Sequence, residues 1–258
     1  MRQGVVGIVV GGLLLAGCGG AENSPAAEPP SPPQQATVTV LAAASLVDVF
    51  EQLEPVFEQA TPGADLQFSF GASSDLAQQI VNGAPADVFA SANASQMKVV
   101  SDAGLAEGTA KVFTTNVLTI VTPIGNPKGI TTFADLARPD VTEVVCAPQV
   151  PCGAATEKIE QVTGVTLSPA SEEPDVRAVL SKVITGEADA GLVYVTDARS
   201  AVDQLVQIDF PEAREAINEY FIAGLREAPQ PRYAQAFVDF ILGPDGQQAL
   251  VDAGFGKP

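Results

Sequence analysis

Apolar positions along this chain recur with two different periods, which predict strands and helices in alternation. Residues 38–45 begin with alternating β-branched residues and end in small ones, which is typical of a strand leading into a turn. Apolar residues then recur every three or four positions over residues 46–60, the period of one helix face. Ser45 is therefore expected at the N-cap of this helix, where free amides and the helix dipole suit an anion. Most N-cap serines bind nothing, so this position alone indicates only a cap.

A second junction of the same kind follows at Ser73. Residues 64–70 alternate with period two and predict a strand, and a small turn then leads into a helix over residues 75–81. In an open parallel sheet both serines would lie at the carboxyl edge, where ligands bind. Two such junctions within one βαβ unit indicate a ligand site more strongly than one does.

The rest of the chain continues this alternation and predicts an α/β fold with parallel sheets. Later strands are predicted at residues 113–121, 141–147, 166–170, 190–197, 205–210 and 219–225. Helices are predicted at residues 132–137, 154–163, 177–185 and 232–242, with one more that ends at residue 253. Asn93 or Ser95 can cap an earlier helix that ends near Gly104. Pro174 suits the first turn of the helix at 177–185, which leaves the Val176 amide unpaired.

Composition excludes several classes of function. The 258 residues carry a net charge of −18, so nucleic acid and anionic membrane surfaces are poor partners. The chain has no His, which removes Ser-His-Asp and Cys-His catalysis and the usual zinc sites. No spacing singles out a catalytic pair among the many carboxylates. We therefore expect a binding protein and not an enzyme.

The N-terminus has the pattern of a targeting segment. Arg2 precedes an apolar run over residues 5–16, which is too short for a comfortable transmembrane helix. The run ends in Leu-Ala-Gly-Cys, which resembles a bacterial lipoprotein signal and implies cleavage before Cys18 and lipidation of that residue. Residues 1–17 are then a signal peptide and 18–35 a Pro-rich tether, with the body anchored outside the cytoplasmic membrane. The alternative is an ordinary secretory signal with an incidental cysteine.

Two further cysteines, Cys146 and Cys152, remain in the body of the chain. An even pair in an oxidising compartment suggests a disulfide. Two free buried thiols and a redox-active pair are the alternatives, and the five-residue spacer argues against the redox pair.

Seven segments carry a resemblance to a known family. They are residues 42–46 (AAASL), 70–74 (FGASS), 83–89 (GAPADVF), 150–153 (VPCG), 175–177 (DVR), 191–194 (GLVY) and 237–255. In this order they resemble the periplasmic molybdate-binding proteins of ABC transporters, here in a lipoprotein form. The resemblance covers nearly the whole chain after the tether.

The resemblance implies a two-lobed periplasmic-binding-protein fold of type II. Each lobe would be a mainly parallel sheet flanked by helices, with the ligand in the cleft between the lobes. Residues 36–117 plus 219–258 would form the first lobe and residues 118–218 the second. The implied function is capture of molybdate, and of tungstate, for an ABC permease with its ATPase. We expect a monomer without a cofactor, attached to the membrane only through its lipid.

The resemblance also implies a ligand set, which falls on Ser45, Ser73, Cys152, Val176 and Tyr194. Three hydroxyls and two backbone amides would hold the oxyanion. The family commonly has alanine at the position of Cys152, and a backbone donor tolerates this change. None of the five is Lys or Arg, so charge-assisted hydrogen bonds of about 1.5–3 kcal/mol each would have to offset burial of a dianion.

Other ligands and roles stay open at this point. Sulfate shares the charge and shape of molybdate, so a sulfate-binding protein is the main alternative. Phosphate is disfavoured because it carries a proton near neutral pH, which needs a carboxylate as its hydrogen-bond acceptor. None of the five residues is Asp or Glu. Ferric iron is disfavoured because carboxylates and clustered tyrosines usually hold it, and the five residues do not supply them. A lipoprotein that binds nothing is the remaining alternative.

Overall fold

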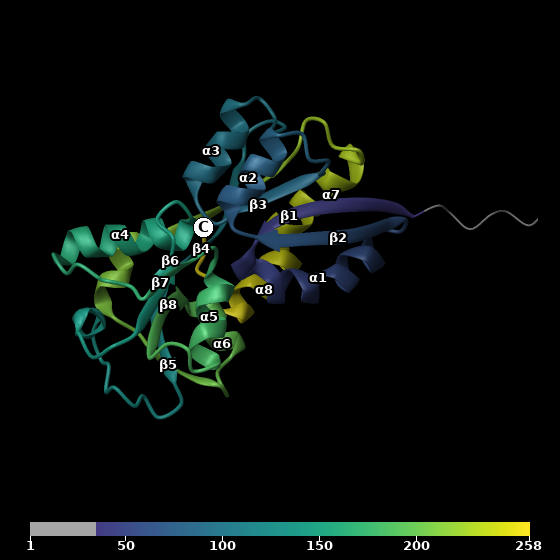
Figure 1. Ribbon diagram of the computed structural model, residues 1–258. Helices are drawn as coiled ribbons and strands as arrows, with labels where there is room; N and C mark the ends of the chain where they lie inside the picture. Colours follow the sequence, from purple (N-terminus) through teal and green to yellow (C-terminus); the bar gives the residue numbers. More distant parts are fainter. Residues whose placement is uncertain (1–34) are drawn as a thin grey trace, which may run out of the picture. The chain divides into compact units, whose positions relative to one another are not determined.

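Two five-stranded sheets with their own helices make up the part of the chain that the computed structural model describes, residues 35–258 (Figure 1). The predicted signal peptide, the cysteine expected to carry a lipid (Cys18) and nearly all of the expected tether lie outside these residues. Within the described residues, no helix has the length and apolar character needed to cross a membrane.

The first sheet is built from both ends of the described chain. Its strand order is β2 (Ala64–Gly71), β1 (Ala36–Ala43), β3 (Val88–Ser91), β10 (Asn218–Gly224), β4 (Lys111–Asn116). Its helices are α1 (Val47–Ala60), α2 (Ser73–Val81), α3 (Ala94–Asp102), α7 (Pro231–Leu242) and α8 (Pro244–Ala253). One apolar core joins α1, α7 and α8 to the strands, and a second core joins α2 and α3 to them.

The second sheet comes from the middle of the chain. Its strand order is β7 (Ser171–Glu173), β6 (Glu143–Cys146), β8 (Ala190–Tyr194), β5 (Leu118–Pro123), β9 (Leu205–Ile208). Its helices are α4 (Pro151–Thr163), α5 (Val176–Ile184) and α6 (Val195–Ser200). Short 3₁₀ turns lie at η2 (Phe133–Ala137) and η3 (Pro211–Ala216), and a third, η1 (Ala44–Leu46), follows β1. One core cluster spans this half.

Both sheets are mixed, which corrects the expectation of mainly parallel sheets. In the first, β1 runs parallel to β2 and β3, but β10 runs antiparallel to β3 and β4. In the second, β6 runs parallel to β7 and β8, but β5 runs antiparallel to β8 and β9. The antiparallel strands include β4, β5 and β10, which lie where the chain passes from one sheet to the other.

The predicted strand at 113–121 is in fact two strands. β4 ends at Asn116 and β5 begins at Leu118, and the two belong to different sheets. Asn116 also pairs with Asn218 in the ladder between β4 and β10, so the outgoing and returning crossings lie side by side. Residues 113–121 contain no Gly or Pro that would mark a break, so the sequence does not reveal this change of sheet.

The predicted strand at 166–170 does not form, and only Ser171–Glu173 pair as β7. Side chains take the backbone donors that a ladder would need: the Leu167 amide donates to Glu160 Oε1 at 2.6 Å and the Ser168 amide to Glu143 Oε1 at 2.9 Å. Pro169 has no N–H at all. The segment therefore forms no strand, although the Ala170 amide still donates to the Glu143 carbonyl of β6 at 2.9 Å.

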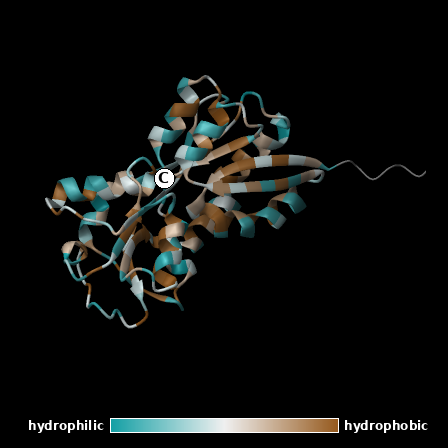
Figure 2. Cartoon of the chain, viewed as in Figure 1, coloured by the Kyte–Doolittle hydropathy of each residue, from teal (hydrophilic) through white to brown (hydrophobic). Residues whose placement is uncertain are grey.

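The helical period of α1 is borne out with a narrower face than predicted. Val49, Phe50, Leu53 and Phe57 are buried, whereas Val56 is 43 % exposed. The ring of Phe50 packs against those of Phe68, Phe113 and Phe237. Figure 2 shows apolar residues concentrated in the strands and polar residues along the outer helices. This packing holds α1 firmly, and so fixes the turn that precedes it.

Candidate functional site

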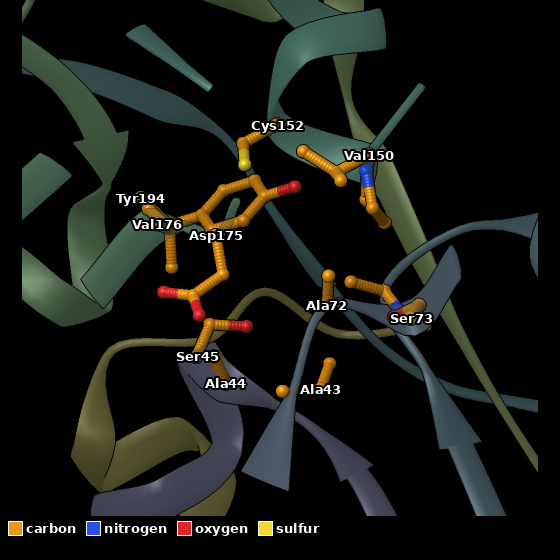
Figure 3. Close-up of a pocket in the computed structure, with 13 residues that line it drawn as sticks. Ala43, Ala44, Ser45, Ala72, Ser73, Val150, Cys152, Asp175, Val176 and Tyr194 are labelled. Atoms are coloured by element: carbon orange, nitrogen blue, oxygen red, sulfur yellow. The ribbon is translucent and has the colours of Figure 1, made fainter. Parts of the chain in front are cut away.

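A small pocket lies where β1, β2 and β8 end and where α2, α4 and α5 begin (Figure 3). Its cavity volume is about 20 Å³, far below the range of pockets that hold drug-sized ligands, so it suits an ion or a very small molecule. The lining residues are Ala43, Ala44, Ser45, Gly71, Ala72, Ser73, Ala92, Val150, Pro151, Cys152, Asp175, Val176 and Tyr194. All five residues of the expected ligand set line this one pocket.

Ser45 lies in the pocket but is not the helix cap that the sequence predicts. A 3₁₀ turn, Ala44–Leu46, stands between β1 and α1, and Leu46 takes the N-cap position without a side-chain bond. The Ser45 hydroxyl is buried and lies 2.7 Å from the hydroxyl of Tyr220. The tight turn thus directs the serine away from its own helix and leaves its hydroxyl beside the pocket.

Ser73 is the first residue of α2, and Ala72 is the N-cap. Its side chain is fully buried, and its Oγ accepts a hydrogen bond of 3.0 Å from the Ala92 amide. Because that amide can only donate, the hydroxyl proton of Ser73 is free to point elsewhere. Because Ser73 lines the pocket, this proton can point into the pocket.

Cys152 lies in the first turn of α4, which begins at Pro151, three residues earlier than predicted. An amide in a first turn has no partner within its helix, so this N–H can serve a ligand. The structure joins Cys152 to Cys146 as a disulfide, which ties the first turn of α4 to the end of β6. Gly153 packs so closely that a Cβ would lie 1.9 Å from the Ala147 carbonyl oxygen. The disulfide and this contact both hold the turn against β6.

Val176 begins α5, and Asp175 is its N-cap. Asp175 Oδ1 accepts hydrogen bonds from the amides of Arg177 at 2.8 Å and Ala178 at 3.0 Å. The Val176 amide precedes these two and again has no intrahelical partner. Pro174 therefore lies before the cap and not in the first turn, because the Asp175 carboxylate sets the start of the helix.

Asp175 is the lining residue that the sequence reasoning missed, although an Asp before an apolar helical run is a standard N-cap signal. Its presence weakens the argument against phosphate, which assumed no carboxylate at the site. Its carboxylate accepts hydrogen bonds from two backbone amides of α5, so much of its charge stabilises the start of that helix.

Tyr194 ends β8, and its side chain is only 1 % exposed. Its hydroxyl has no hydrogen-bond partner among the described residues, and Figure 3 shows it directed into the space between Ser45, Ser73 and Val150. Burial, then the neighbouring Tyr220 and Asp197, raise the pKa of Tyr194 well above its usual value. The group therefore stays protonated and is a permanent donor. A buried polar group without a partner costs about 1–3 kcal/mol, which points to a ligand.

No lysine or arginine lines this pocket in residues 35–258. Arg177 follows Val176 but turns away: its Nη2 bonds Asp48 Oδ2 and its Nη1 bonds Ser200 Oγ at 3.2 Å. Its Nε lies 2.9 Å from Asp197 Oδ1, an ion pair at an angle that makes no hydrogen bond. The site thus gathers neutral donors, three hydroxyls and two helix-start amides, which is an arrangement that suits an anion without protons.

The chain matches the sequence model described as "Bacterial extracellular solute-binding protein" over residues 38–256. It is 48 % identical over 254 residues to the molybdate-binding protein ModA of Mycobacterium tuberculosis H37Rv, covering 97 % of each chain. It is 25 % identical over 277 residues to a sulfate-binding protein of Synechococcus elongatus, covering 94 % of this chain and 78 % of the relative.

The fold is similar to that of the periplasmic molybdate-binding protein of Azotobacter vinelandii, with a TM-score of 0.75. The match covers 86 % of this chain and 99 % of that one, at 22 % sequence identity. At this level of identity the likeness shows a shared two-lobed fold.

Proposed function

This chain belongs to the bacterial extracellular solute-binding proteins, with molybdate-binding proteins among its relatives, and we propose that it captures molybdate for an ABC transporter. Tungstate, which has the same charge and shape, would bind at the same site. The oxyanion would lie in the pocket between the two lobes, residues 36–117 with 219–258 and residues 118–218. The expected delivery partner is a membrane permease with its ATPase.

The observation that carries this proposal is the buried hydroxyl of Tyr194, which has no partner among the described residues and faces the pocket. In the proposed complex it donates to one oxyanion oxygen. Ser45 and Ser73 donate from their hydroxyls, and Cys152 and Val176 donate from their backbone amides. Molybdate at neutral pH is a dianion without protons, so a set made only of donors matches all of its oxygens.

Sulfate is the second candidate, since it presents the same charge and geometry. The relatives favour molybdate, because the named molybdate-binding relative is 48 % identical and the sulfate-binding relative 25 %. Phosphate would carry a proton near neutral pH, and Asp175 is the one carboxylate in the lining that could accept it. Its role as the cap of α5 argues against that use.

Calorimetric titration with molybdate, tungstate, sulfate and phosphate in parallel tests the assignment. We expect one molybdate and one tungstate per chain, weaker sulfate binding and no phosphate binding. Tight sulfate binding with weak molybdate binding would instead identify the chain as a sulfate-binding protein. No heat with any of the four would leave a lipoprotein that binds no oxyanion.

The anchor is a separate proposal. A lipid on Cys18, attached when residues 1–17 are removed, would hold the protein to the outer face of the cytoplasmic membrane, with residues 18–35 as a tether. We expect Cys18→Ser to be released into the soluble fraction or left unprocessed, since acylation needs the thiol. Normal processing with retention in the membrane fraction would remove the lipid anchor.

A further inference from the structure

Tyr220 lies directly behind the pocket but does not line it. It is on β10, is fully buried, and its hydroxyl lies 2.7 Å from Ser45 Oγ. Its ring packs edge-on against those of Tyr194, Phe113 and Phe255, with centroids 5.6–6.2 Å apart. The ring is thus fixed on several sides, and the hydroxyl can move little relative to Ser45.

Each of these two hydroxyls has one proton to give, so the direction of their hydrogen bond decides what Ser45 can do. If Ser45 donated to Tyr220, its proton would be unavailable to a ligand. Among the described residues, Ser45 Oγ is the one hydrogen-bond partner of the Tyr220 hydroxyl. Burial also raises the pKa of Tyr220, so its proton stays in place at neutral pH.

Ser73 shows the same arrangement with a donor whose direction is certain. The Ala92 amide donates to Ser73 Oγ from behind at 3.0 Å, which leaves the serine proton for the pocket. Both serines at the site therefore have a second group bonded to their oxygen on the side away from the ligand. At Ser73 this group is backbone, whereas at Ser45 it is a side chain that can be changed.

Resting on the proposed function, we infer that Tyr220 is a positioning residue of the oxyanion site. It donates its proton to Ser45 Oγ and so commits the Ser45 proton to the ligand. The bond also polarises the Ser45 hydroxyl and makes it a stronger donor. Tyr220 acts on affinity without touching the anion.

A double-mutant cycle separates this role from simple packing. Molybdate affinity is measured by calorimetry for wild type, Tyr220→Phe, Ser45→Ala and the variant with both changes. Tyr220→Phe keeps the ring and removes only the oxygen, and we expect it to weaken binding about tenfold. In the Ser45→Ala background the same change should alter affinity less than twofold, since the group through which it acts is gone.

The control is Tyr233→Phe, the same chemical change at a half-buried tyrosine on α7 that does not line the pocket. It should bind as wild type does. Thermal unfolding without ligand is recorded for every variant, so that a general loss of stability is recognised.

Equal losses from Tyr220→Phe in the two backgrounds would overturn the inference and leave a packing effect. Wild-type affinity in Tyr220→Phe would overturn it as well, while the proposed function would stand. If wild type itself bound no oxyanion, the proposed function would fail and the inference with it.

Discussion

At the scale of single residues, the hydroxyl of Tyr194 is the most informative group in the molecule. It is buried, remains protonated, and finds no partner in residues 35–258. Tyr194→Phe should therefore cost binding without harming the fold. A hydrogen bond to a charged group contributes about 1.5–3 kcal/mol, so molybdate affinity should fall roughly 10–150-fold.

Calorimetry measures that loss, and unfolding of the ligand-free variant measures its stability. The variant should be at least as stable as wild type, since an unpartnered polar group has been removed. Lys158→Ala is the control, because Lys158 is exposed on α4 and should leave affinity unchanged. Unaltered affinity in Tyr194→Phe would contradict the ligand role.

Asp197 gives a second prediction at this scale, on stability. Its side chain is fully buried, and burial raises its pKa to about 7 despite the opposing charge of Arg177. The folded protein then holds a proton that the unfolded chain releases near the ordinary value of 3.8. This stabilisation is complete below pH 3.8 and is lost as pH rises through about 7.

Asp197→Asn removes that dependence while its side-chain oxygen can still accept from the Tyr194 amide, as Asp197 Oδ2 does at 3.2 Å. Between pH 4 and 7.5 the variant should gain stability relative to wild type, by at most about 4 kcal/mol. Chemical denaturation at several pH values measures the difference. A difference that stays constant, or that shrinks as pH rises, would mean that Asp197 is ionised throughout.

The residue scale also shows what the sequence could and could not predict. The resemblance selected five residues, and all five line one pocket. The bonding of the serines was not predictable: Ser45 was expected to cap a helix, yet it contacts Tyr220, 175 positions away in the sequence. The periodicity of apolar positions reports only on residues close together in the sequence, so it gives no sign of a partner on a distant strand.

At the scale of elements, helix starts and strand ends form the site. Of the two predicted caps of α3, Asn93 and Ser95, the structure uses Asn93, whose side chain accepts from the Gln96 amide. The strand ends were less predictable. The strand expected at 190–197 stops at Tyr194, where the Asp197 carboxylate accepts from the Tyr194 amide and α6 begins. A competing side-chain bond of this kind is invisible to a count of apolar positions.

The Cys146–Cys152 disulfide fixes the start of α4 against β6. Purified protein should show no free thiol among these two until it is reduced. Reduction should weaken molybdate binding only a few-fold, since the Gly153 contact still holds the turn. Thiol titration and calorimetry before and after reduction measure both effects. Two thiols titrating in unreduced protein would refute the disulfide.

Arg177 joins three elements that each lie next to an expected ligand residue. It follows Val176 on α5, faces Asp197 on α6 after Tyr194, and bonds Asp48 on α1 after Ser45. The sequence alone gives Arg177 no role at the site beyond its position next to Val176. The ion pair with Asp48 instead links an element of one sheet to an element of the other.

Asp48→Asn should therefore weaken molybdate binding slightly, because it loosens a contact across the two halves of the molecule. Exposed ion pairs contribute about 0.2–1 kcal/mol, which limits the effect to about fivefold. Asp102→Asn is the matched control, since Asp102 pairs with Lys98 within α3 alone. A loss greater than tenfold in Asp48→Asn would show that the ion pair does more than join the halves.

At the scale of the whole molecule, a strongly acidic protein is expected to bind a dianion. The net charge of −18 repels the ligand at long range, but salt screens this beyond roughly 8 Å at physiological ionic strength. Attraction must then come from short-range donors, the hydroxyls and helix-start amides of the pocket. A site built on lysine or arginine would respond to salt in the opposite sense, because screening would weaken its own attraction.

The affinity for molybdate as a function of sodium chloride concentration, at fixed pH, tests this account most directly. Held by neutral donors within an acidic body, the anion should bind equally well, or up to a few-fold more tightly, as salt rises from about 10 mM to 500 mM, since screening only reduces repulsion. A tenfold or greater fall in affinity over that range would contradict the account, because it would require a cationic group in contact with the ligand.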